Sequence, residues 1–203
     1  MPSKNHNSVI QFEVDQDHAP ACQERDILDL ERWRLQLRSR RLLGRDPERY
    51  DGLGYGNLSA RMPDGTVIIT GSQTGHLPSL GPAHYARILD FDPERNWVRS
   101  RGLVKPSSET MTHLAIYQSA ASVKFVFHTH YPELWHAGKA LELPMTDARA
   151  ECGTIGLFYS VLKLLEEEAF CRRRILAIGG HEDGIMSWGE TADEAGLALA
   201  IAV

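Results

Sequence analysis

The stretch Val123-Lys124-Phe125-Val126-Phe127-His128-Thr129-His130 decides how this chain is organised. Its apolar residues follow one another without helical spacing, which is typical of a buried strand, and Pro132 ends the strand just beyond it. Because residues two apart in a strand point to the same face, His128 and His130 present two imidazoles side by side at a strand end. This spacing favours a shared metal ion. The alternative is a pair of histidines with ordinary structural partners.

A second histidine motif follows another short apolar run. The strand expected over residues 175–178 leads into Gly179-Gly180-His181-Glu182-Asp183-Gly184. Glycine lets the backbone approach a site closely, so His181 is a candidate third ligand at another strand end. A tight turn explains the same glycines equally well.

Polar residues at the expected start of a helix form a third candidate. The stretch KPSSE at 105–109 precedes a run with helical spacing. Ser107 and Ser108, with the free amides of a helix N-terminus, suit an anion, and Glu109 beside them could ligate a metal or move a proton. A plain helix cap is the alternative. His113 lies four residues past Glu109 on the same helix face, and we expect it to be structural.

Two loops rich in Gly, Ser, Thr and Asn complete the candidates. They are GNLS at 56–59 and TGSQTG at 70–75, both at expected strand ends. Backbone N–H groups in such loops can cradle a phosphate. Ordinary turns use the same residues, so the loops alone are not specific.

The remaining elements follow from spacing and turn residues. Ile27, Leu30, Trp33, Leu37 and Leu42 recur at three- to five-residue steps and predict a helix. The turn PDG at 63–65 predicts a hairpin of strands at 58–61 and 66–70. We also expect a hairpin of strands at 86–91 and 97–100, and helices at 155–169 and 191–203. Strands and helices alternate irregularly, which favours a layered sheet-plus-helix domain over a parallel doubly wound one.

Composition and charge limit the class of protein. The 203 residues are 42% hydrophobic and 24% charged, as in one globular domain. A net charge of −5, from 22 basic and 27 acidic residues, argues against general nucleic-acid binding. No apolar run approaches the roughly 20 residues that cross a bilayer, so we expect no membrane association.

The N-terminus and the cysteines limit the class further. Residues 1–22 are polar and aperiodic and are expected to form a flexible tail, followed by one domain at 23–203. The tail lacks the apolar core of a secretory signal, so the expected compartment is the cytoplasm. Cys22, Cys152 and Cys171 include no Cys-x-x-Cys pair, which fits reduced thiols and argues against a cysteine metal site.

These motifs together resemble one family. In order and spacing, GNLSAR at 56–61, ITGSQTG at 69–75, KPSSETMTHLAIY at 105–117, HTHYPELW at 128–135 and the glycine-flanked His181 are similar to the class II aldolase and adducin head domain family. The family contains sugar-phosphate aldolases, epimerases and dehydratases. The resemblance runs from Leu30 to the C-terminus and identifies the family without specifying a member.

The resemblance implies a fold and a metal site. The fold is an α/β domain with three α/β/α layers around a largely antiparallel sheet. His128, His130 and His181 are implied to bind zinc, or another divalent ion such as manganese, iron or cobalt. Glu109 is implied to be the acid/base and to ligate the metal when substrate is absent.

The resemblance also implies a substrate and a reaction. The substrate is a small molecule, either a phosphorylated sugar or a related hydroxy-carbonyl compound. The residues implied to hold its phosphate are Asn57, Thr74, Gly75, Ser107 and Ser108. The implied reaction is retro-aldol cleavage through a metal-stabilised enediolate, with the metal acting as a Lewis acid.

Two departures from the family pattern stand out. The family usually has Gly directly after the third histidine, whereas here Glu182, Asp183 and Gly184 follow. Asp183 is therefore an alternative third ligand; we prefer His181 because the family combines three histidines with a carboxylate. The aldolases also use a tyrosine after the His-x-His strand, but residues 143–149 contain none. Asp147 and Glu151 are the candidate substitutes.

Three functions are compatible with these motifs. The leading hypothesis is a metal-dependent aldolase-type lyase, and the second is an epimerase or dehydratase on the same scaffold. The third is a non-catalytic, adducin-like binding module. The joint presence of His128, His130 and Glu109 favours an enzyme, since a scaffold has no need of them. Family sites lie between subunits, so the resemblance also implies a homotetramer.

Overall fold

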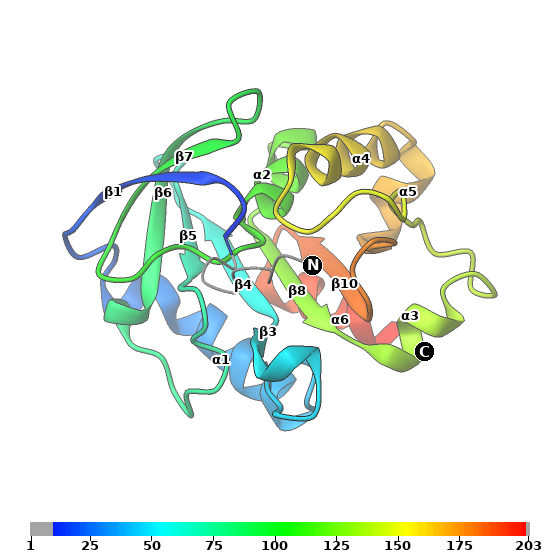
Figure 1. Cartoon of the computed structure of the whole chain (residues 1–203), viewed down its shortest axis with the longest axis horizontal. Coiled ribbons are helices and arrows are strands. Elements are labelled where there is room, and N and C mark those ends of the chain that lie inside the picture. Colours follow the sequence, from blue (N-terminus) through cyan, green and yellow to red (C-terminus); the bar gives the residue numbers. More distant parts are fainter. Residues whose placement is uncertain (1–9, 202–203) are drawn as a thin grey trace, which may run out of the picture.

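An eight-stranded sheet forms the middle of the molecule in the computed structural model, which describes residues 10–201 (Figure 1). The strand order is β1-β7-β6-β5-β4-β8-β10-β9. Neighbours pair antiparallel throughout this order except β1 and β7, which are parallel. The strands are β1 Glu13–Asp17, β4 Asn57–Arg61, β5 Val67–Thr70, β6 Tyr85–Asp92, β7 Trp97–Gly102, β8 Phe125–His130, β9 Ile175–Ala177 and β10 Gly184–Gly189.

Helices cover both faces of this sheet (Figure 1). Side chains alternate along β8, so Val126 joins a buried cluster with Met111 and Leu157, whereas Phe127 joins a separate one with Trp33. The first cluster lies under α2 and α4 and the second under α1 and α6. This confirms the predicted three-layer α/β/α fold with a largely antiparallel sheet. The helices are α1 Glu24–Ser39, α2 Thr110–Ser119, α3 Pro132–Ala137, α4 Ile155–Leu165, α5 Glu168–Arg173 and α6 Ala192–Ile201.

The predicted elements are mostly present, with shifted ends. The two predicted hairpins are β4–β5 and β6–β7. The apolar positions that predicted the first helix are buried in α1, except Leu42, which is buried beyond the end of that helix. The helix expected over 155–169 is divided into α4 and α5. The helix expected to start within residues 106–109 begins at Thr110, with Glu109 as its N-cap. The part of the last helix beyond residue 201 lies outside the described residues.

Three short sheet elements were not predicted. β10 is a central strand, and its short run Ile185-Met186-Ser187-Trp188 has no alternation because all of it is buried. The pair β2 Gly44–Arg45 and β3 Gly54–Tyr55 forms a separate small sheet. Such short segments carry too little periodicity to be read from sequence.

The N-terminal segment requires a correction. Residues 13–17, expected to belong to a flexible tail, form β1 and pair with β7 from Glu13↔Trp97 to Asp17↔Arg101. The exposed and half-buried residues of β1 alternate as on a sheet edge, and an edge strand that is polar on its open side gives little apolar signal. Residues 1–9 of the expected tail lie outside the described residues.

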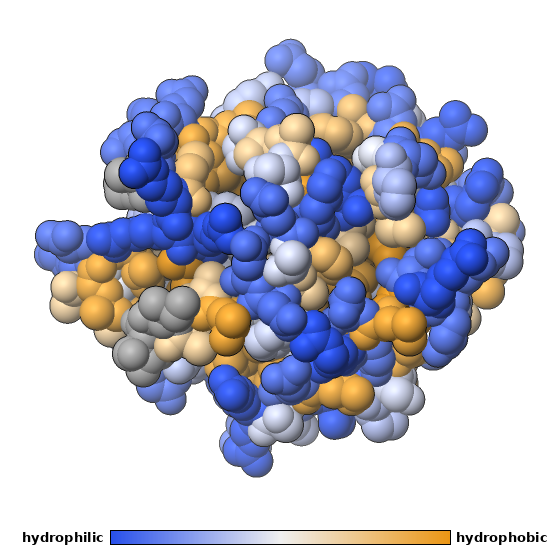
Figure 2. All heavy atoms as spheres, turned by 180° about the vertical axis from the view of Figure 1, so that it is seen from behind, coloured by the Kyte–Doolittle hydropathy of each residue, from blue (hydrophilic) through white to orange (hydrophobic). Residues whose placement is uncertain are grey.

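Several large hydrophobic side chains remain on the surface. Leu28 is 61% exposed, Leu103 55% and Leu197 52%. On the face seen from behind, hydrophobic side chains gather in patches between hydrophilic ones (Figure 2). Within residues 10–201, no helix is long and apolar enough to cross a membrane.

The contact between α1 and α6 depends on one glycine. A Cβ added at Gly196 would lie 2.3 Å from Cζ3 of the buried Trp33 indole. Trp33 Nε1 also donates a hydrogen bond to Asp193 Oδ1 on α6 at 2.8 Å, which limits how far the ring can move. Close packing of the second core cluster therefore requires Gly at position 196.

Gly196→Ala should destabilise the domain. We expect the free energy of unfolding to fall by about 1 to 3 kcal/mol because the new methyl overpacks the core, despite the roughly 1 kcal/mol by which alanine is the better helix former. The measurement is urea unfolding. Gly81→Ala is the control, since a Cβ there meets no atom within 4 Å. Equal midpoints for the two variants would contradict this packing.

Candidate metal centre

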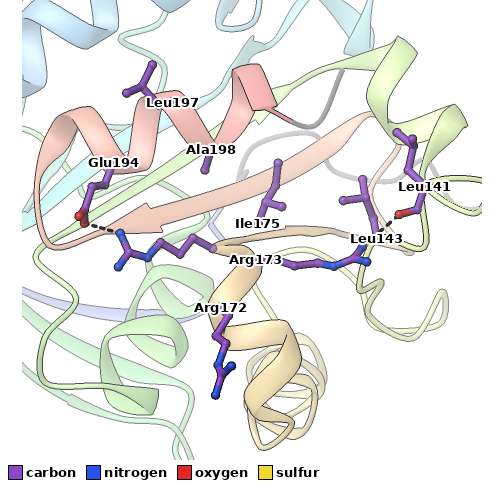
Figure 3. Close-up of a pocket in the computed structure, with 9 residues that line it drawn as sticks. Leu141, Leu143, Arg172, Arg173, Ile175, Glu194, Leu197 and Ala198 are labelled. Carbon is purple, nitrogen blue, oxygen red and sulfur yellow. Dashed lines mark hydrogen bonds and ion pairs between the residues drawn. The ribbon is translucent and has the colours of Figure 1, made fainter.

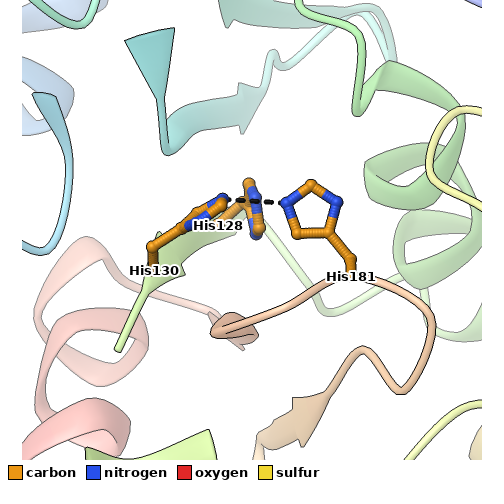
Figure 4. Close-up of side chains that lie close together, drawn as sticks. All are labelled: His128, His130 and His181. Carbon is orange, nitrogen blue, oxygen red and sulfur yellow. Dashed lines mark hydrogen bonds between the residues drawn. The ribbon is translucent and has the colours of Figure 1, made fainter. Parts of the chain in front are cut away.

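Three histidine rings meet where β8 ends (Figure 4). One ring nitrogen from each of His128, His130 and His181 lies within 4.8 Å of the others. The Nε2 atoms of His130 and His181 are 2.8 Å apart. His128 and His130 are buried, and His181 is partly exposed. The structure thus brings together all three histidines predicted as ligands.

Strand pairing fixes the first two rings. In register, His128 lies opposite Asn57 of β4 on one side and Met186 of β10 on the other. The Nδ1 of His128 lies 3.3 Å from the carbonyl oxygen of Ile185. Donation of the Nδ1 proton to this carbonyl leaves the lone pair on Nε2, as is usual for metal-binding histidines.

Two glycines fix the third ring. His181 belongs to the turn between β9 and β10, where Gly184 N–H donates to the His181 carbonyl at 2.9 Å. A Cβ on Gly179 would lie 2.3 Å from the Thr146 carbonyl oxygen, and one on Gly180 would lie 2.4 Å from that of Ala150. Only glycine allows this turn to pack against residues 146–150 and hold His181 beside the strand end.

Asp183 has different partners. Its carboxylate accepts hydrogen bonds from Tyr50 Oη at 2.5 Å and from Arg49 Nη2 at 3.4 Å. It is absent from the histidine group that the described residues form. Of the two candidate third ligands, the geometry therefore favours His181.

The histidine group suits a divalent metal chemically. Burial lowers the pKa of His128 to about 4, although Glu109 acts in the opposite direction. Burial and the charges of His128 and His181 lower the pKa of His130 well below its usual range. Both rings are thus neutral near pH 7 and keep the lone pairs that a metal needs. Three convergent imidazoles fit zinc or a similar ion.

Glu109 lies beside this group and is buried. Its Oε1 is 3.5 Å from His181 Nδ1 and accepts a hydrogen bond from the Cys152 thiol. Its Oε2 accepts from Thr112 Oγ1 at 2.7 Å. Burial raises the pKa of this carboxyl, but the nearby histidines and these two donors outweigh burial and lower the pKa to about 2. Glu109 is therefore a carboxylate, the form that accepts a proton.

The predicted phosphate-binding residues share the same pocket. Its lining includes the predicted phosphate-binding residues together with the predicted base and the three predicted histidine ligands: Asn57, Thr74, Gly75, Ser107, Ser108, Glu109, His128, His130 and His181. The pocket has a volume of about 40 Å³, which is room for an ion or a water molecule. Asn57 Oδ1 is buried without a hydrogen-bond partner in the described structure, as suits a group kept for a ligand.

Sequence reasoning missed the aromatic side of the site. Tyr50 contacts His130 edge-on with ring centroids 4.2 Å apart, and Tyr55 lines the pocket. Tyr50 and Asp51 adopt left-handed backbone conformations, with φ of 51° and 56°. This conformation is uncommon for residues other than glycine, and no sequence pattern in this region predicts it.

The remaining candidates lie away from the pocket lining. Asp147 is exposed and paired with Arg149 at 2.7 Å, and Glu151 is also exposed, so neither suggested proton donor lines the pocket. His113 is fully buried, and its Nδ1 lies 2.7 Å from Ser59 Oγ. That contact is consistent with the expected structural role.

A larger groove lies elsewhere, between α5, β9 and α6 (Figure 3). Its volume is about 650 Å³. Its arginines are already paired: Arg174 with Glu194 at 2.5 Å, and Arg173 with the Leu141 carbonyl at 3.0 Å. Among the described residues, no histidine lines this groove. The chemistry of the side chains, and not the size of the hollow, identifies the smaller pocket as the candidate site.

Fold and pocket together define an α/β protein with a histidine-rich site of the kind found in metal-dependent enzymes. The profile of the Class II Aldolase and Adducin N-terminal domain matches residues 45–202. The chain belongs to this family.

Two individual relatives are similar in sequence to part of this chain. It is 34% identical over 77 residues to methylthioribulose-1-phosphate dehydratase of Gluconacetobacter diazotrophicus, covering 37% of this chain and 34% of the relative. It is 39% identical over 77 residues to 3-oxo-tetronate 4-phosphate decarboxylase of Haemophilus influenzae, covering 38% of this chain and 33% of the relative. These matches span about a third of the relatives' lengths.

The fold is also that of a solved aldolase. The crystal structure of l-fuculose-1-phosphate aldolase from Thermus thermophilus has a TM-score of 0.59 at 18% identity, covering 86% of this chain and 87% of the other. At this identity the likeness concerns the fold alone. The relatives named here are enzymes, and their names span three reaction types.

Metal content is the direct check on the histidine group. We expect untagged protein to bind about one divalent ion per chain, and His128→Ala/His130→Ala to lose the ion that the histidines hold, because two of their three donors are gone. Elemental analysis after incubation with zinc, manganese or cobalt is the measurement. His136→Ala is the control, since that side chain is 66% exposed on α3 and outside the group. Wild-type protein that holds no metal would refute the centre.

Proposed function

We propose that this chain is a divalent-metal-dependent lyase that cleaves a carbon–carbon bond in a small sugar phosphate or related hydroxy-carbonyl compound. One observation carries the proposal: His128, His130 and His181 converge beside the ionised Glu109 in one pocket. That pocket also contains the hydroxyl and amide groups of three loops. Such a reaction needs side chains that bind the metal, a base that accepts a proton, and groups at the edge of the pocket that bind an anion.

Each part has a proposed role. The three histidines hold the ion, which is zinc or another divalent metal such as Mn2+, Fe2+ or Co2+. When bound, that ion polarises the substrate's carbonyl as a Lewis acid. Glu109 accepts the proton released as the bond breaks and returns it to the product. Burial of Glu109 among fixed donors keeps its carboxylate oriented during this transfer.

The rim of the pocket is proposed to hold the phosphate. Its polar groups come from the start of β4, from the loop after β5 and from the segment before α2; they belong to Asn57, Thr74, Gly75, Ser107 and Ser108. Amide groups before a helix carry partial positive charge and suit an anion. The phosphate would thereby orient the reacting carbons toward the histidine group.

A second candidate function is dehydration or decarboxylation on the same site. It is supported by the identities of 34% and 39% to a dehydratase and a decarboxylase. The lack of a tyrosine at 143–149 also weakens the case for the aldolases' proton donor. Epimerisation, which uses the same metal and base, is a further variant. A non-catalytic module has no use for a buried, ionised Glu109 beside three histidines.

A substrate screen separates these reactions. Protein loaded with zinc, manganese or cobalt is incubated with small sugar phosphates, 3-oxo sugar-acid phosphates and their unphosphorylated forms. New aldehyde indicates aldol cleavage, released carbon dioxide indicates decarboxylation, and loss of water by mass indicates dehydration. Aldehyde formation would support the leading proposal. Dehydration or decarboxylation alone would replace it with the second candidate, and metal-loaded protein inert to every compound would favour a binding module.

Replacing the base tests its role directly. Glu109→Gln should lower kcat by a factor of about 10² to 10⁴, the usual contribution of general acid–base catalysis. The histidine-held metal should remain, because Glu109 is outside the three-nitrogen group. Steady-state kinetics with elemental analysis measures both. Glu133→Gln, on the exposed surface of α3, should keep the full rate. Unchanged kcat in Glu109→Gln would remove this residue from the mechanism.

We also propose that the chain assembles as a homotetramer. Exposed Leu28, Leu35 and Leu197 lie on α1 and α6, with 61%, 45% and 52% of their surface open. Neighbouring copies would cover such side chains. Size-exclusion chromatography with light scattering should give about four times the protomer mass. A monomer at micromolar concentration would contradict this assembly.

A further inference from the structure

His181 lies between two groups of possible metal ligands. Its Nε2 faces His130, while its Nδ1 faces Glu109 at 3.5 Å. On that second side, Cys152 Sγ contacts Glu109 Oε1. One ligand atom from each of Glu109, Cys152 and His181 lies within 4.8 Å of the other two, and these three form a second group that shares only His181 with the three histidines.

The fold builds this second group from three distant segments. Cys152 is held by the turn before α4, where Gly153 has φ of +73° and a Cβ added to it would lie 3.1 Å from the Ser108 carbonyl oxygen. The same stretch packs against Gly180, whose absent side chain leaves space for the Ala150 carbonyl. Glycine at both positions thus brings the thiol, the start of α2 and the β9–β10 turn together.

We propose that Glu109, Cys152 and His181 form a second divalent-cation site, adjoining the histidine group and specific for thiophilic ions such as Zn2+, Cd2+ and Co2+. Thiolate, imidazole and carboxylate are the donors that zinc takes in proteins. The thiolate selects these ions over magnesium and calcium, which prefer all-oxygen sites. Sequence spacing argued against a cysteine ligand, but proximity in the fold supplies one.

The two sites differ in their donors and share one ring. A donor such as Cys152 Sγ can join one metal with His128 and His130 only if all their ligand atoms lie close together, and among the described residues they do not form one group. The neutral imidazole of His181 has a single lone pair, so it serves the histidine site through Nε2 or the second site through Nδ1.

Binding at the second site is balanced in charge. The Cys152 thiol loses its proton to solvent as the ion binds, and the resulting thiolate and the Glu109 carboxylate together neutralise a divalent charge. Without an ion, the thiol instead donates its hydrogen to Glu109. Cys152 and His181 are both partly exposed, which leaves a route for the ion and a position for water.

Cobalt spectroscopy on the full-length protein tests this site. Co2+ is titrated into metal-free protein while the near-ultraviolet thiolate-to-cobalt charge-transfer band is followed. We expect the band in wild-type protein, its loss in Cys152→Ser, and its retention in Cys171→Ser, which carries the same change at a cysteine outside the group. Cys152→Ala repeats the test without a hydroxyl, and circular dichroism checks the folding of each variant.

The histidine variant separates this proposal from the proposed lyase site. His128→Ala/His130→Ala should keep the charge-transfer band while losing the histidine-held ion. Wild-type protein without the band, or an unchanged band in folded Cys152→Ser, would overturn the second site even if the histidine site holds metal. Loss of the band in the histidine variant would also overturn it, because Cys152 would then ligate the histidine-held ion.

Discussion

The pairing of β8 with β4 and β10 is the constraint on which the rest of the site depends. This ladder buries Val126 and Phe127 on opposite faces and leaves His128 and His130 at the strand end. Because side chains alternate with a period of two, a register slip of one residue would exchange the two core faces and move the histidines with them. Packing of both helical layers and placement of the metal donors are therefore decided by the same hydrogen bonds.

Around this strand, the two carboxylates nearest the histidines accept hydrogen bonds, whereas Asn57 Oδ1 and His130 Nδ1 are buried without a partner among the described residues. Glu109 is buried yet ionised, and Thr112 and Cys152 both donate hydrogen bonds to its carboxylate. Asp183 is similarly held by Tyr50 and Arg49 on the other side of the site. His128, His130 and His181 are left with neighbouring ring nitrogens that suit a shared metal ion. These features are why we propose that the pocket holds a metal ion.

Agreement between sequence and structure varies with the strength of the local signal. The helical spacing of Ile27, Leu30 and Trp33 predicts α1 correctly, and the turn at 63–65 predicts the β4–β5 hairpin. The polar edge strand β1 and the short central strand β10 give no comparable periodicity. Whether a strand lies at the edge or in the interior of a sheet depends on the tertiary structure, because strands from elsewhere in the chain provide its hydrogen-bond partners.

By itself, the sequence determined the layered fold class and the candidate ligands of the pocket, because strand alternation and glycine-flanked turns are local and need no partner. Only the tertiary structure decided between His181 and Asp183, since one side chain turns toward β8 and the other toward Tyr50. It also placed Cys152 against Glu109, which are 43 positions apart in the chain. Contacts of this kind arise from packing between elements, and no spacing within the sequence encodes them.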